Sequence, residues 1–62
     1  MNANQVYQIA REFWLASGER TPERLGALID RYANVYALSP EARQEAQGLP
    51  GKDWRFAANR SV

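Results

Sequence analysis

The side chains with catalytic potential in this chain are hydroxyls, carboxylates and one amine, because it contains neither histidine nor cysteine. Nucleophilic catalysis requires a serine, threonine, cysteine or lysine beside an activating base. The candidate nucleophiles have no imidazole to deprotonate them; they are Ser17, Thr21, Ser39, Lys52 and Ser61. The carboxylates fall on expected solvent faces or in first helical turns, where they interact favourably with the helix dipole. We therefore expect no catalytic residues and no enzyme activity.

The same composition argues against a metal or a cofactor. Structural zinc sites use thiolate and imidazole ligands, and the chain has none. The glycines stand at positions 18, 26, 48 and 51, which is not the spacing of a phosphate-binding loop. The sequence predicts neither a metal site nor a cofactor site.

Aromatic residues offer a different kind of chemistry, which is recognition. They make up 11% of the chain, which is more than we expect a small helical core to hold. Tryptophan, tyrosine and arginine are enriched where partners contribute most binding energy. We assign Phe13, Tyr32 and one of the two tryptophans to the core. The candidate contacts with a protein partner, or with a second copy of the chain, are Trp54, Arg55 and Phe56, together with Tyr7 and Trp14.

The segment from Tyr32 to Glu41 resembles the first helix and turn of a helix-turn-helix, as found in many bacterial repressors. The resemblance is carried by alanines at 33 and 37, followed by Leu-Ser-Pro at the next helix start. It ends at Arg43, where such a motif has an apolar anchor for its recognition helix. This alternative implies that Arg43, Gln44 and Gln47 contact base edges. Two glutamates on the same helix would repel the DNA phosphates and so oppose binding.

Charge and hydropathy favour neither a nucleic acid nor a membrane as partner. The formal net charge is +1, which gives no strong attraction for a polyanion. The longest apolar run is 13–16, whereas a membrane-spanning helix needs about 20 apolar residues. We expect a cytoplasmic protein of a bacterium or phage.

Two similar helix starts organise the chain, Thr21-Pro22-Glu23 and Ser39-Pro40-Glu41. Each has a hydroxyl at the N-cap, a proline at the first helical position and a carboxylate in the first turn. With Gly18 and Gly48 as helix ends, they predict a single all-α domain over 1–62. Its helices cover about 3–17, 22–36 and 40–47, the first two form a hairpin, and the tail at 49–62 packs back.

The helical spacing of apolar residues predicts which faces of the first two helices turn inward. On the first helix this row consists of Val6, Ile9, Ala10, Phe13 and Ser17, with Tyr7, Trp14 and Leu15 widening the face. On the second helix it consists of Leu25, Leu28, Ile29, Tyr32 and Tyr36. We expect Gly26 to allow close approach of the first helix; the alternative is that the second helix simply tolerates a glycine there.

These observations favour a non-catalytic protein–protein interaction module, such as a small regulator or an accessory or inhibitor protein. A second copy of the chain is one acceptable partner. The alternatives are a helix-turn-helix-like DNA-binding regulator and, more remotely, an accessory chain that lends residues to a larger enzyme.

The cluster at 54–56 is testable by combining Trp54→Ala with Phe56→Ala. If these rings contact a partner, the double variant loses association and keeps its helical circular dichroism, because the helices do not depend on them. A parallel loss of helicity would show that the tail belongs to the core.

Overall fold

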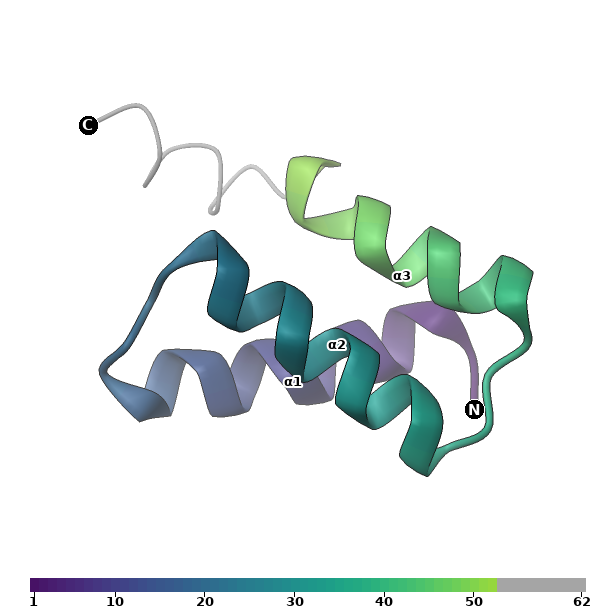
Figure 1. Cartoon of the computed structure of the whole chain (residues 1–62), viewed down its shortest axis with the longest axis horizontal. Helices are drawn as coiled ribbons and strands as arrows, with labels where there is room; N and C mark the ends of the chain where they lie inside the picture. The colour runs from purple at the N-terminus through teal and green to yellow at the C-terminus, as the bar shows by residue number, and fades with distance from the viewer. Residues whose placement is uncertain (53–62) are drawn as a thin grey trace.

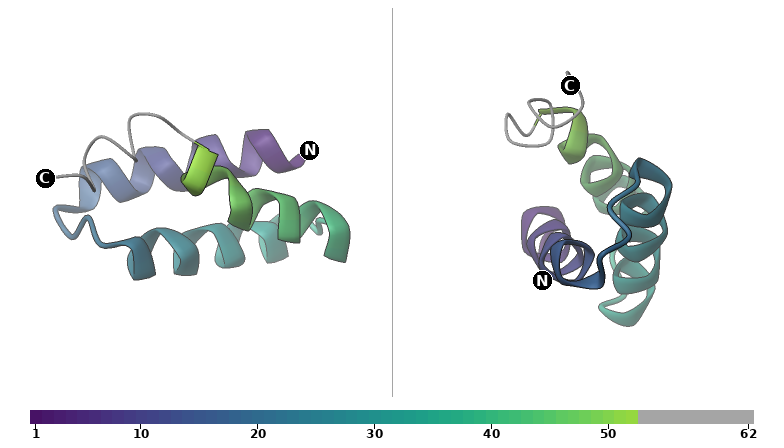
Figure 2. Two further views of the ribbon diagram at one scale, coloured as in Figure 1. Left: turned by 90° about the horizontal axis from the view of Figure 1, so that it is seen from above. Right: turned by 90° about the vertical axis from the view of Figure 1, so that its left-hand side faces the viewer.

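The chain folds into three helices, and the computed structural model describes residues 1–52. The helices are α1 (Ala3–Ser17), α2 (Pro22–Val35) and α3 (Pro40–Lys52). α1 and α2 form an antiparallel hairpin, and α3 lies across one side of it (Figures 1 and 2). Each helix contacts both of the others. The predicted all-α architecture is confirmed.

The two proline-containing helix starts behave as predicted. The Thr21 hydroxyl accepts a hydrogen bond from the backbone N–H of Arg24 at 3.2 Å, at the start of α2. The Ser39 hydroxyl accepts one from the N–H of Ala42, also at 3.2 Å, at the start of α3. Each hydroxyl satisfies an N–H group that has no partner within its helix.

α1 also begins and ends where the sequence indicates. Asn2 caps its start, with the Gln5 N–H donating to the Asn2 side chain at 2.9 Å and the Asn2 N–H donating to the Gln5 side chain at 2.8 Å. This reciprocal pair is a capping box. Gly18 ends the helix with a φ of +81°, a conformation that glycine adopts without steric cost.

α2 ends at Val35 rather than at 36, in a turn that uses an alanine where glycine is common. The N–H of Leu38 donates to the carbonyl of Ala33 at 2.9 Å, and the N–H of Ala37 donates to the carbonyl of Asn34 at 3.2 Å. These two bonds define a Schellman motif. Ala37 accordingly has a φ of +54°.

The predicted end of the third helix was wrong, because α3 continues through Pro50 to Lys52. The physical reason is the helical spacing of Ala42, Ala46 and Leu49. Ala46 is fully buried, and the other two pack against the core. Pro50 lies in the last turn of α3, where it lacks an N–H to donate and its ring crowds the carbonyl of Ala46; the packing of Ala46 and Leu49 outweighs this cost. The rest of the predicted tail, 53–62, lies outside the described residues.

The core uses only part of the predicted face of α1: Val6 and Ala10 are buried as expected, but Ser17 is exposed. Phe13, assigned to the core, is 54% exposed, whereas Trp14 is 4% exposed. α1 is turned so that one row of residues lies between α2 and α3. Tyr36, expected inside, is 40% exposed at the end of α2. The buried residues are Ala3, Val6, Tyr7, Ala10 and Trp14 on α1, Leu25, Leu28, Ile29 and Ala33 on α2, and Ala46 on α3.

Gly26 faces α3 rather than α1, which corrects the expected close approach of the first helix. A Cβ atom at this position would lie 3.6 Å from Oε1 of Gln47, an ordinary van der Waals distance. Space is therefore available for a side chain on α2.

Replacing Gly26 by alanine should stabilise the protein by about 0.5–1 kcal/mol, because alanine loses less backbone entropy in a helix. Urea denaturation followed by circular dichroism measures the change. Gly18→Ala is the contrasting control: its φ of +81° disfavours alanine, so this variant should lose stability. A loss at Gly26 as well would show that the contact with Gln47 cannot accept a methyl group.

Candidate functional site

The most exposed aromatic side chain among the described residues forms a pair on the surface of the hairpin. The ring of Phe13 on α1 stacks on the ring of Tyr32 on α2, with centroids 5.4 Å apart and planes 17° from parallel. Phe13 is 54% exposed, and Tyr32 is partly buried. The pair closes the seam between the two helices and leaves one apolar ring open to solvent.

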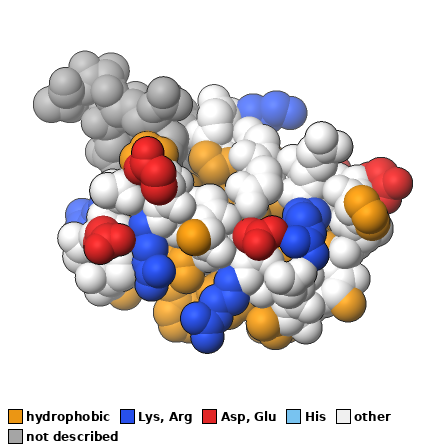
Figure 3. All heavy atoms as spheres, viewed as in Figure 1, with side chains coloured by type: hydrophobic (Ala, Val, Ile, Leu, Met, Phe, Trp, Pro, Cys, Tyr) orange, Lys and Arg blue, Asp and Glu red, His pale blue; other side chains and the backbone are white. Residues whose placement is uncertain are grey.

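Apolar residues extend this pair along both helices. Ile9 and Ala16 lie one turn to either side of Phe13 on α1, and Val35, which is 62% exposed, lies one turn beyond Tyr32 on α2. Hydrophobic side chains are visible along the lower edge of the molecule, over α1 and α2 and away from α3 (Figure 3). We call this surface the hairpin face; it consists of Ile9, Phe13, Ala16, Tyr32 and Val35.

Two of the predicted partner contacts are instead buried. Tyr7 is 3% exposed and Trp14 is 4% exposed. The indole Nε1–H of Trp14 donates to the backbone carbonyl of Thr21 at 2.8 Å, which provides the partner that a buried indole requires. These side chains are therefore not surface contacts in this fold. The other predicted contacts, Trp54, Arg55 and Phe56, lie outside the described residues.

The sequence did not predict that Phe13 is exposed, because two rows of residues on α1 have helical spacing and either could face the core. One is Val6, Ile9 and Phe13, of which only Val6 is buried, and the other is Ala3, Tyr7, Ala10 and Trp14, all of which are buried. The second row contains small residues that let α1 approach its neighbours, and the indole N–H at its end needs an acceptor. These two features are the signals that favour the second row, and both depend on tertiary contacts.

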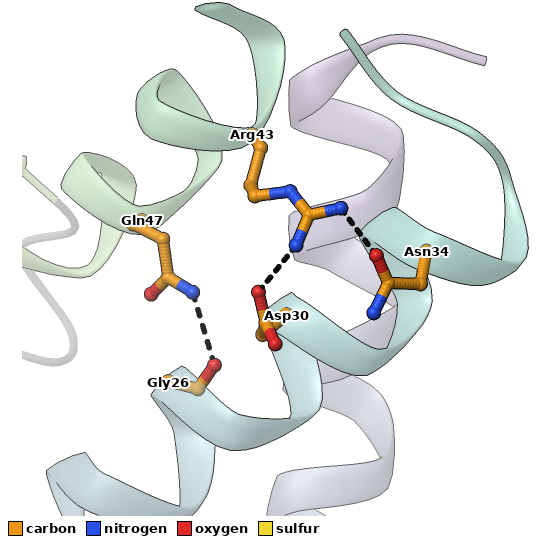
Figure 4. Close-up of polar contacts among 5 residues, drawn as sticks. All are labelled: Gly26, Asp30, Asn34, Arg43 and Gln47. Atoms are coloured by element: carbon orange, nitrogen blue, oxygen red, sulfur yellow. Dashed lines mark hydrogen bonds and ion pairs between the residues drawn. The ribbon is translucent and has the colours of Figure 1, made fainter. Parts of the chain in front are cut away.

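A second surface contains polar residues that tie α3 to α2. The Arg43 guanidinium donates to the Asp30 carboxylate at 2.7 Å and to the side-chain oxygen of Asn34. The Gln47 side chain donates to the Gly26 carbonyl at 3.1 Å. These five residues form a ladder in which successive members on each helix are four residues apart (Figure 4). We call it the α2–α3 ladder.

The three residues of the DNA-binding alternative lie together along this ladder. They line an open groove of about 550 Å³ whose walls are Asp30, Leu38, Pro40, Arg43, Gln44 and Gln47. Arg43 and Gln47 use their side chains within the protein, and the Asp30 carboxylate faces the same groove. Contact of Arg43 or Gln47 with bases would require breaking these bonds, whereas Gln44 is exposed. The Asp30 carboxylate would repel phosphates. DNA binding therefore stays an untested alternative that this geometry does not favour.

Two other kinds of feature, a metal site and a membrane-spanning helix, are absent from the described residues. Among residues 1–52, no three histidine, cysteine, aspartate or glutamate side chains come together as a metal site. Within the same residues, no helix is both long enough and apolar enough to cross a membrane. Comparison with protein-family models, curated proteins and solved structures finds no match to this chain.

The α2–α3 ladder should contribute modestly to stability, because Arg43 and Asp30 are 35% and 54% exposed. A double-mutant cycle with Arg43→Ala and Asp30→Ala should give a coupling energy of about 0.2–1 kcal/mol, as for other exposed ion pairs. Denaturation in urea measures it, and added salt should weaken it. Glu45→Ala, at an exposed site on α3, is the control. Greater stability of Arg43→Leu would contradict a favourable role for this arginine.

Proposed function

We propose that this chain is a non-catalytic interaction module that contacts another protein through the hairpin face. The observation that carries the proposal is the exposure of Phe13, which leaves an apolar ring in water although it stacks on Tyr32. Contiguous apolar residues on a small protein's surface are typical of protein contact sites. A partner that covered this face would remove Phe13, Ile9 and Val35 from water.

The stacked pair also suits this role energetically. Burying a large apolar side chain contributes about 1.5–3 kcal/mol. Because about half of Phe13 is still exposed in the free protein, about half of this free energy would be gained when a partner covers it. Its ring is held by Tyr32, so binding would cost little side-chain entropy. The other residues of the hairpin face stand on helices, so their backbone is already ordered before a partner binds.

The α2–α3 ladder is a weaker candidate for the same role. Its polar groups already donate to acceptors within the protein, so a partner would have to replace those bonds. The role of the α2–α3 ladder is better explained as holding α3 in position on the hairpin. We therefore place the functional contact on the opposite side of the hairpin from α3.

The proposal is tested by capturing the tagged protein from a lysate of its source organism before and after nuclease treatment. A protein chain, including an untagged copy of this one, should be retained after nuclease. Phe13→Ser should abolish that retention, because a hydroxymethyl group cannot replace the apolar contact that the ring makes with the partner. Glu45→Arg on α3 should retain the chain. Recovery of nucleic acid alone, or of the same proteins with Phe13→Ser, would contradict the proposal.

A further inference from the structure

We infer that the hairpin face binds a second copy of this chain in a two-fold symmetric dimer. The inference rests on the proposed function, because it uses the same surface, and it adds the identity of the partner. Its basis is the distribution of charge on either side of the stacked pair.

The two edges of the hairpin face carry opposite charges. Each residue of a helix is rotated by about 100° from the one before it, which places Glu12 beyond Phe13 on the outer edge of α1 and Arg31 beyond Tyr32 on the outer edge of α2. Both are exposed, and neither forms an ion pair or hydrogen bond within residues 1–52. Since the two rings are in contact, the two charges stand at similar heights along the hairpin.

This arrangement is complementary to itself under one symmetry operation. A two-fold axis parallel to the hairpin places α1 of one copy over α2 of its partner. In a two-fold interface every contact occurs twice, so each Glu12 meets an Arg31 across the dimer. The same rotation brings Val35 of each copy toward Ile9 of the other, because these residues lie one turn from the stacked pair on opposite helices.

The resulting assembly has a familiar packing geometry. Two antiparallel hairpins joined face to face make four helices in which each neighbour runs antiparallel, the arrangement of an up-down four-helix bundle. α3 stays on the outside of both copies, since it lies on the opposite side of its hairpin (Figure 2). The stacked aromatic pairs then occupy the centre of the interface, where water is excluded and contacts contribute most.

Other partners fit the same evidence less well. A partner of uniform charge would meet one attractive edge and one repulsive edge. A partner with acidic and basic edges in the reverse order is required, and a rotated copy of this chain provides them. Electrostatic matching of this kind selects partner and orientation.

The experiment is sedimentation equilibrium of the purified full chain at several concentrations, with charge variants that test the pairing. The chain should dimerise reversibly, and Phe13→Ser should leave it monomeric. Glu12→Arg and Arg31→Glu should each weaken the dimer about tenfold or more, because each places like charges across the interface. The double variant Glu12→Arg with Arg31→Glu should recover dimerisation, since it restores opposite charges. Glu45→Arg, an equal charge change on α3, should dimerise like the original chain.

Circular dichroism of each variant separates loss of the dimer from loss of the fold. A chain that is monomeric at every concentration would overturn the inference, as would a dimer unaffected by Phe13→Ser or a double variant that stays monomeric. If the monomeric chain still captured another protein through Phe13, the proposed function would stand and only the second copy would be rejected. If nothing were captured and no dimer formed, both would fail.

Discussion

The hydrogen bond from the Trp14 indole to the carbonyl of Thr21 fixes the geometry on which the rest of this fold depends. It joins the last turn of α1 to the N-cap of α2, so one buried side chain sets the hairpin's connection. Loss of a buried tryptophan typically costs about 3–5 kcal/mol. A chain of 62 residues has a total stability of about 3–9 kcal/mol. A single side chain therefore accounts for a large part of what keeps the protein folded.

That constraint also determines which side of α1 is visible. With Trp14 turned inward, the row that contains Tyr7 and Ala10 lies against α2 and α3. Phe13, one residue earlier, is rotated by about 100° around the helix axis and comes to the edge of the seam. Its exposure thus follows from the burial of its neighbour. The hairpin face arises from the same rotation that forms the core.

α3 is held on the hairpin by two alanines, one leucine and a few polar side-chain bonds rather than by large aromatic side chains. Ala46 is fully buried, Ala42 and Leu49 pack on the core, and Arg43 and Gln47 bond to α2. An isolated helix of this length and composition would be marginal in water. The polar ladder contributes little energy per bond, but it specifies how α3 sits on the hairpin, and within residues 1–52 α3 leaves Phe13 exposed.

The sequence by itself determined the local structure. The N-caps at Thr21 and Ser39, the helix end at Gly18 and the all-α class follow from hydroxyl and glycine chemistry within a few residues of each boundary. Only the tertiary structure decided which of two helical rows on α1 is buried, and that α3 continues past Gly48 to pack Leu49. Both outcomes depend on contacts between helices that are distant in the sequence. The candidate site is of the second kind. Phe13 and Tyr32 were both predicted as core residues; Tyr32 does pack against the core, whereas Phe13 is exposed and stacks on it where α1 and α2 meet.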